Sequence, residues 1–131
     1  MSFIHAAVET SSVDNARMIF RELLGLAEVS SFNITDKLSS DIFELKPPDE
    51  IMLFEDKTTN VFIEVFINSK MKHHRQDFTH LCFTVDNLEV FLETARAFNL
   101  KIIQTNKEDR IITFIRDKDN NLYEIKQSLK Q

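Results

Sequence analysis

The sequence contains the same order of predicted strands and helices twice. The apolar run Phe3 to Val8 is followed by Ser12, a good helix N-cap, and then by apolar residues at helical spacing as far as Leu24. The same order returns with the apolar run Phe78 to Val85 and a helical stripe from Leu88 to Phe98. Three further runs of strand length follow each predicted helix. The repeat predicts an α+β fold made of two tandem β-α-β-β-β modules.

The two halves match in detail, except for one segment. The helices end at equivalent residues that accept a left-handed backbone, Gly25 and Asn99. An apolar stripe from Leu38 to Leu45, followed by two prolines, predicts a short extra helix in the first half alone. The predicted strands after the helices are 28–34, 50–54 and 61–67 in the first half and 101–105, 110–115 and 122–127 in the second.

The length of 131 residues fits one domain. We expect residues 1–131 to form that domain, with module one at 1–68, a connector at 69–77 and module two at 78–131. The connector is polar and locally basic, which is typical of a solvated link rather than of a binding patch.

Composition excludes several classes of function. A net charge of −5 argues against nucleic-acid and anionic membrane partners. The single glycine excludes the glycine-rich phosphate loops of nucleotide-binding proteins. The one cysteine, Cys82, cannot form an internal disulfide, and the first residues do not resemble a secretion signal. No apolar run approaches the roughly 18 residues of a membrane span, so we expect a reduced, cytoplasmic protein.

Two histidines and two glutamates occupy equivalent positions in the two halves. His5 and His80 lie in the first predicted strands, and Glu64 and Glu124 lie in the last ones. Because side chains alternate between the faces of a strand, the four share a face opposite the apolar residues that pack on the helices. The other residues predicted on that open face form a mixed lining typical of a ligand cleft, namely Ala7, Glu9, Phe62, Phe66, Cys82, Thr84, Leu122 and Lys126. Cys82 by itself is more typical of a small core residue than of a ligand.

These four residues have the donor chemistry of a metal site. Two neutral imidazoles and two carboxylates balance a divalent cation, and the set favours nickel, cobalt, manganese, iron or zinc over calcium. The alternative is that the histidines are satisfied by hydrogen bonds within their strands and that the glutamates face solvent. Their occurrence as equivalent pairs on one face favours the metal site, because an ionised carboxylate inside an apolar strand needs a partner.

Three stretches of the chain, Ile4 to Val8, Phe78 to Leu88 and Phe114 to Glu124, resemble the signatures of the vicinal oxygen chelate superfamily. This superfamily includes glyoxalase I, epimerases, extradiol dioxygenases, and fosfomycin and bleomycin resistance proteins. The resemblance implies a U-shaped mixed sheet around a metal-binding cleft, and a homodimer. It places metal ligands at His5, Glu64, His80 and Glu124. This set is most similar to that of glyoxalase I.

The resemblance implies a lyase or isomerase that acts on a small α-hydroxycarbonyl or thiohemiacetal-type substrate. Glu124, or Glu64 in the equivalent position, would remove a C–H proton, and the metal would stabilise the enediolate. Phe62 and Phe66 would exclude water from the cleft. The alternatives are a small-molecule binding protein of the bleomycin-resistance type without turnover, or an epimerase or dioxygenase of the same superfamily.

One residue supports glutathione as a co-substrate and another argues against it. Asn68 matches a glutathione-contacting asparagine of the glutathione-dependent enzymes. The predicted substrate contacts are Phe62, Phe66, Asn68 and Cys82. Glu9 stands where those enzymes commonly have arginine, and its charge would repel the glutathione carboxylate.

Overall fold

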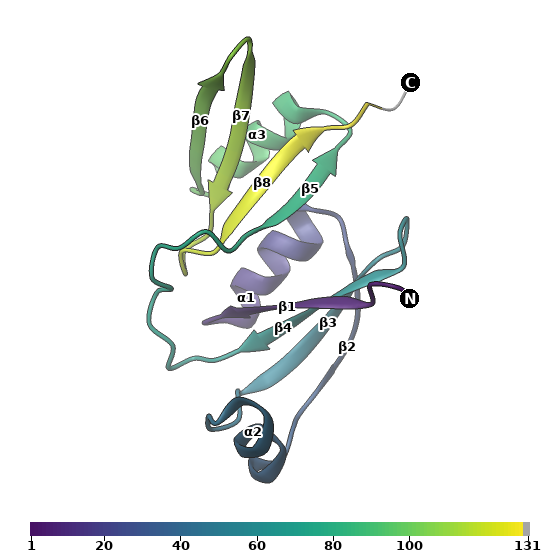
Figure 1. The fold of residues 1–131 in the computed structure, drawn as a ribbon, viewed down its shortest axis with the longest axis vertical. Helices are drawn as coiled ribbons and strands as arrows, with labels where there is room; N and C mark the ends of the chain where they lie inside the picture. The colour runs from purple at the N-terminus through teal and green to yellow at the C-terminus, as the bar shows by residue number, and fades with distance from the viewer. Residues whose placement is uncertain (130–131) are drawn as a thin grey trace. The chain divides into compact units, whose positions relative to one another are not determined.

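Each half of the chain forms a sheet with the same strand pairing, and the two compact units divide between Lys72 and His73 (Figure 1). The computed structural model describes residues 1–129. In both sheets the first strand pairs in parallel with the last, and the remaining pairs are antiparallel. The duplicated β-α-β-β-β order predicted from the sequence is therefore confirmed.

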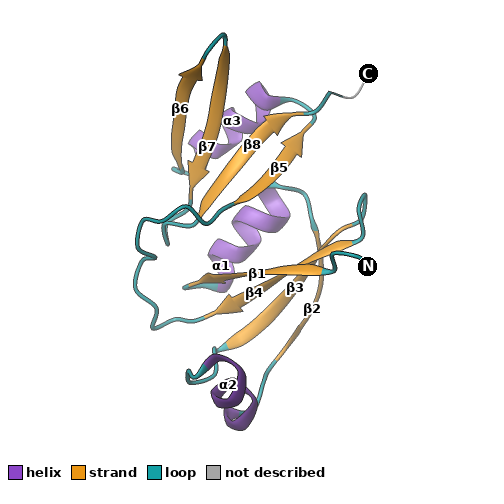
Figure 2. Ribbon diagram, in the orientation of Figure 1, coloured by secondary structure: helices purple, strands orange, loops and turns teal. Residues whose placement is uncertain are grey.

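The first unit has the strand order β1-β4-β3-β2. A short α-helix and a π-helical segment follow β1, and a further helix, α2, lies between β2 and β3 (Figure 2). The bounds are β1 His5–Thr10, α1 Val13–Ala16, η1 Arg17–Leu23, β2 Ala27–Phe32, α2 Asp36–Phe43, β3 Glu50–Asp56 and β4 Val61–Ile67. The extra helix predicted in the first half is thus present.

The second unit repeats this arrangement with the strand order β5-β8-β7-β6. Its bounds are β5 Leu81–Val85, α3 Leu88–Ala97, β6 Lys101–Lys107, β7 Arg110–Arg116 and β8 Leu122–Gln127. Within residues 1–129, no helix is both long and apolar enough to cross a membrane.

The helix boundaries follow the capping residues of the sequence. The Ser12 hydroxyl accepts a hydrogen bond from the Asn15 amide at 3.1 Å and so caps α1. Gly25 has a φ of 73° and Asn99 a φ of 60°, so both provide the predicted left-handed backbone after their helices. The first helix differs from the prediction in one respect: from Arg17 to Leu23 its hydrogen bonding is π-helical.

Other element ends differ by a few residues from the prediction. The helix α2 ends before the prolines, because Glu44 adopts a left-handed φ of 57° and its amide closes the last turn on the Ser40 carbonyl. The strand β5 begins at Leu81, so His80 lies one residue before it rather than within it. The strand β1 begins at His5 instead of Phe3.

The helix-facing sides of the two sheets form the cores. In β4 the alternate residues Ile63, Val65 and Ile67 are buried, and in β8 Tyr123 and Ile125 are buried. The helices add buried side chains of their own, including Ile19, Phe20, Phe91, Leu92 and Ala95. Because neighbouring strand residues point to opposite faces, Glu64 and Glu124 project from the sheet faces away from these cores.

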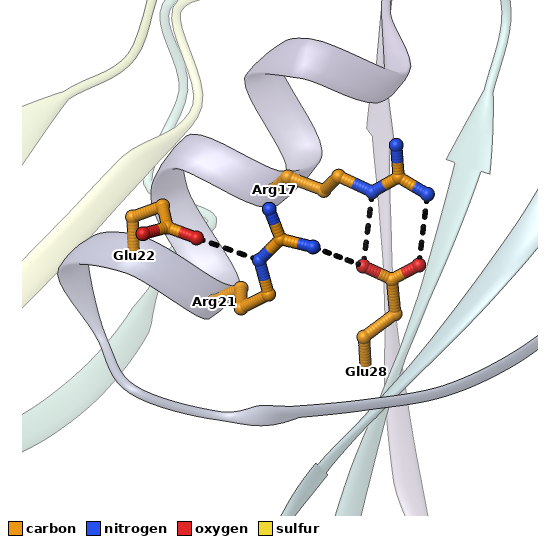
Figure 3. Close-up of polar contacts among 4 residues, drawn as sticks. All are labelled: Arg17, Arg21, Glu22 and Glu28. Atoms are coloured by element: carbon orange, nitrogen blue, oxygen red, sulfur yellow. Dashed lines mark hydrogen bonds and ion pairs between the residues drawn. The ribbon is translucent and has the colours of Figure 1, made fainter.

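An ion-pair network fastens the first helix to β2. The Arg17 guanidinium donates two hydrogen bonds of 2.9 Å to the Glu28 carboxylate, and Arg21 donates a third at 3.0 Å (Figure 3). Arg21 also pairs with Glu22. The hydrogen bond and charge of Arg17 lower the pKa of Glu28. A bidentate pair of this kind fixes geometry as well as charge, so it holds the helix at a set position over the sheet.

Candidate metal centre

The first unit brings His5 and Glu64 together across two neighbouring strands. Ala7 of β1 is the Cα partner of Glu64 in β4, and His5 lies two residues before Ala7 on the same face. The imidazole Nε2 of His5 is 3.4 Å from Oε1 of Glu64. Their side chains are 46% and 23% exposed, so the pair is open to a ligand while Glu64 is mostly covered.

The second unit repeats this relationship with His80 and Glu124. Cys82 of β5 is the Cα partner of Glu124 in β8, and His80 lies two residues before Cys82. The Nε2 atom of His80 is 3.8 Å from Oε1 of Glu124, with side-chain exposures of 35% and 18%. Each unit therefore brings one of the predicted histidines beside one of the predicted glutamates.

A backbone hydrogen bond defines the donor state of His80. Its Nδ1 atom is 2.9 Å from the carbonyl oxygen of Phe78. Because a carbonyl can only accept, Nδ1 carries the hydrogen, and in the neutral imidazole the lone pair then lies on Nε2. That lone pair is on the side of Glu124, whose carboxylate oxygens are acceptors too. A metal ion that bound between these two acceptors would be coordinated by both of them.

The ring of His80 also has an aromatic neighbour. Phe114 of β7 makes a T-shaped contact with it, with ring centroids 5.3 Å apart and an interplanar angle of 69°. The same Phe114 is the Cα partner of Glu124. The sequence analysis did not single out Phe114, because alternation alone places a residue on a face without saying which strand lies next to it.

Cys82 differs from the expectation of a small core residue. It is exposed, and it lies directly across from Glu124. Partial burial, the negative charge of Glu124 and a hydrogen bond to its carboxylate raise the pKa of the Cys82 thiol. The thiol is therefore protonated near neutral pH and donates to Glu124. A protonated thiol is neither a good nucleophile nor a soft metal ligand.

The other predicted contacts lie on the same face of the first sheet as Glu64. Phe62 is the Cα partner of His5, and Phe66 is the partner of Glu9. Phe66 also makes an edge contact with Phe43 at the end of α2, with ring centroids 5.4 Å apart. The Asn68 amide donates a hydrogen bond of 2.8 Å to the Glu9 carboxylate. The predicted substrate contact Asn68 is thus held by the acidic residue that disfavours glutathione.

Each unit brings together one histidine and one glutamate. Among residues 1–129, no three His, Cys, Asp or Glu side chains gather closely enough to hold a metal ion. Either pair alone would bind a divalent cation weakly, because structural and catalytic sites commonly use three or four protein ligands. The nitrogen and oxygen donors of each pair suit a borderline divalent cation.

The sequence profile of the Glyoxalase/Bleomycin resistance protein/Dioxygenase superfamily matches residues 2–125. The chain belongs to this superfamily, as its signature segments suggested. The search of curated proteins gives no match.

Solved structures share the fold at low sequence identity. A glyoxalase family protein from Bacillus cereus has a TM-score of 0.71 and 16% identity, covering 99% of this chain and 94% of its own. The trypanothione-dependent glyoxalase I of Leishmania major has a TM-score of 0.71 and 12% identity, covering 97% of this chain and 86% of its own. A mutant of the fosfomycin resistance protein FosX from Listeria monocytogenes, solved with Mn(II) and a dihydroxypropylphosphonic acid, has a TM-score of 0.67 and 16% identity, covering 95% and 90%.

Proposed function

We propose that this chain is a metal-dependent enzyme of the glyoxalase I type, a lyase or isomerase that moves a proton next to a carbonyl. Its substrate would be a small α-hydroxycarbonyl or thiohemiacetal. The cation would be nickel, cobalt, manganese, iron or zinc, held by His5, Glu64, His80 and Glu124. We also propose that the protein works as a homodimer, as its resemblance to the superfamily implies.

The observation that supports the proposal is the approach of a histidine Nε2 to a glutamate oxygen in both units, at His5 and Glu64 and at His80 and Glu124. Each pair places an imidazole Nε2 and a carboxylate oxygen within 4 Å of one another, at 3.4 and 3.8 Å. Two equivalent pairs give the N2O2 donor set that suits a borderline divalent cation and leaves coordination positions for substrate oxygens.

The carboxylates supply the proton chemistry. When bound, the cation would polarise the substrate carbonyl and make the adjacent C–H more acidic. Glu124, or Glu64 at the equivalent position, would accept that proton and return it to the neighbouring carbon. Phe62 and Phe66, on the same face as Glu64, would limit the access of water to the reacting carbons.

The experiment combines metal loading with proton exchange. Purified protein would be loaded with nickel, cobalt, manganese or zinc and incubated in D2O with a small α-hydroxyketone, and deuterium incorporation would be followed by NMR. The proposal expects exchange only in the metal-loaded protein, and its loss in Glu64→Gln or Glu124→Gln. An unchanged exchange rate in both variants would mean that the site is misplaced.

A binding protein without turnover is the second candidate. It is favoured by the 2.8 Å hydrogen bond from the Asn68 amide to the Glu9 carboxylate. This bond engages the amide that was predicted to contact glutathione, and it places an acidic side chain beside it. In that case the cleft would hold an apolar or cationic compound. A metal-free protein that shows no thermal stabilisation with any of the four metals would favour this candidate over the enzyme, because a ligand of the native state raises its stability.

A further inference from the structure

The environments of the two glutamates differ, although their strand positions are equivalent. Glu124 lies between Cys82 of β5 and Phe114 of β7. Glu64 lies between Ala7 of β1 and Leu53 of β3. The first unit therefore has an aliphatic side chain at the position where the second unit has an aromatic ring.

That ring contacts the histidine of the second pair. Phe114 is half-buried on the face away from the core, and its ring meets that of His80 in a T-shaped arrangement. The imidazole has a second restraint in the 2.9 Å contact of Nδ1 with the Phe78 carbonyl. Together these two contacts restrict both the ring plane and the direction of Nε2. This restraint matters because His80 lies outside β5, where no strand pairing holds it.

We propose that Phe114 is a positioning residue that fixes the imidazole of His80 beside Glu124. The expected effect of Phe114 on metal affinity rests on the proposed function. Its effect on the position of the His80 ring does not, because that position is a property of the metal-free protein. A preset donor loses less conformational freedom when it binds, so the His80–Glu124 pair is the better organised half of the donor set.

The test replaces Phe114 by the residue type of the equivalent position in the first unit. Phe114→Leu keeps an apolar side chain but removes the aromatic ring, whereas Phe114→Tyr keeps an aromatic ring. Phe83→Leu is the matched control. It removes another phenylalanine of the same unit, whose ring lies 6.4 Å from Tyr123, on the core side of β5. Each variant would be compared with the wild type by NMR of the histidine rings, by thermal unfolding and by cobalt titration.

The NMR measurement is made on metal-free protein at an alkaline pH, where imidazoles are neutral. The His80 ring signal, assigned with His80→Gln, should move in Phe114→Leu because the ring current of Phe114 is lost. The signals of His5, His73 and His74 should stay in place. Phe83→Leu should lower the unfolding temperature without moving the His80 signal. A His80 signal that stays in place in Phe114→Leu, or moves equally in Phe83→Leu, would overturn the proposal.

The cobalt titration tests the consequence. Phe114→Leu should bind cobalt about three- to tenfold more weakly than the wild type, the range expected for one aromatic pair. Phe114→Tyr and Phe83→Leu should bind within about twofold of the wild type. Equal affinity in Phe114→Leu and the wild type would contradict the proposal. A wild type that binds none of the five metals, nickel, cobalt, manganese, iron and zinc, would instead refute the proposed function, and the NMR result would still decide the role of Phe114.

Discussion

Cys82 lies directly across from Glu124 in the parallel pair of β5 and β8, and its thiol donates a hydrogen bond to that carboxylate. Burial and the charge of Glu124 raise the pKa of the thiol, so at neutral pH the reactive thiolate is scarce. We expect iodoacetamide to alkylate Cys82 more slowly than a free thiol, with a pH midpoint above the ordinary cysteine value.

The variant Glu124→Gln removes one cause of this shift and leaves the burial. The pKa of Cys82 should fall, and alkylation at neutral pH should become faster. Glu93→Gln, which removes an exposed charge on α3, is the control and should leave the rate unchanged. Equal rates in Glu124→Gln and the wild type would show that the carboxylate does not act on the thiol.

The Arg17–Glu28 pair predicts a loss of stability in acid. The pKa of Glu28 is lowered from 4.5 in the folded protein, so its contribution is present above 4.5 and is lost as the pH falls through the lower folded value. Glu28→Gln should lower the free energy of unfolding by about 1 kcal/mol at neutral pH. Urea unfolding at a series of pH values should show the difference between variant and wild type shrinking below 4.5.

The neighbouring carboxylate provides the control for that series. Glu22 pairs with Arg21, and its side chain is 52% exposed, against 26% for Glu28. Glu22→Gln should change the free energy of unfolding by less than about 0.5 kcal/mol at any pH. A larger loss in Glu22→Gln than in Glu28→Gln would contradict the assignment of the stabilising pair.

A substitution at the end of the first helix should lower the free energy of unfolding through backbone conformation alone. Gly25 has a φ of 73°, and a Cβ atom added there would meet nothing within 4 Å. Gly25→Ala should therefore destabilise the fold by about 1 kcal/mol through backbone strain alone. Gly25→Asn should cost less, because Asn99 adopts a φ of 60° at the equivalent position. Chemical denaturation of both variants measures this, and equal losses would show that strain is not the cause.

The turn before β8 depends on a buried carboxylate. Asp117 is 7% exposed and accepts hydrogen bonds from the amides of Asp119 and Asn121 and from the hydroxyl of Tyr123. Tyr123→Phe should lower the free energy of unfolding by about 2 kcal/mol, because a bond to a buried charged group is lost. Its affinity for metal should stay unchanged, since Tyr123 faces the core and Glu124 the opposite side. A variant as stable as the wild type in urea would contradict this role.

The pH dependence of that variant follows from the tyrosine itself. Burial, and then the charge of Asp117, raise the pKa of Tyr123 well above 10.0. The hydroxyl therefore stays protonated in the folded protein throughout the neutral range. The stability difference between Tyr123→Phe and the wild type should be constant between about pH 6 and 9. A difference that varied within this range would indicate that another group titrates at the turn.

Periodicity predicted the repeated elements and placed His5, Glu64, His80 and Glu124 on the open faces of their sheets. These features depend on local spacing, which a sequence displays directly. The exposure of Cys82 and the role of Phe114 depend on register, because the neighbour of Glu124 is set by how β7 and β8 align. The helix α2 ends at Phe43 because Glu44 has a left-handed backbone. A glutamate side chain does not favour that conformation, so the sequence did not predict this end.

The metal affinity of the intact protein shows whether His5, Glu64, His80 and Glu124 bind one cation. Nickel would be titrated calorimetrically into metal-free wild type and into His5→Ala, Glu64→Gln, His80→Ala and Glu124→Gln, with Glu93→Gln as the control. We expect one nickel per chain in the wild type and in the control, and at least about tenfold weaker binding in each of the four variants. Wild-type binding that all four substitutions leave unchanged, or a wild type that binds no nickel, cobalt, manganese, iron or zinc, would contradict this expectation.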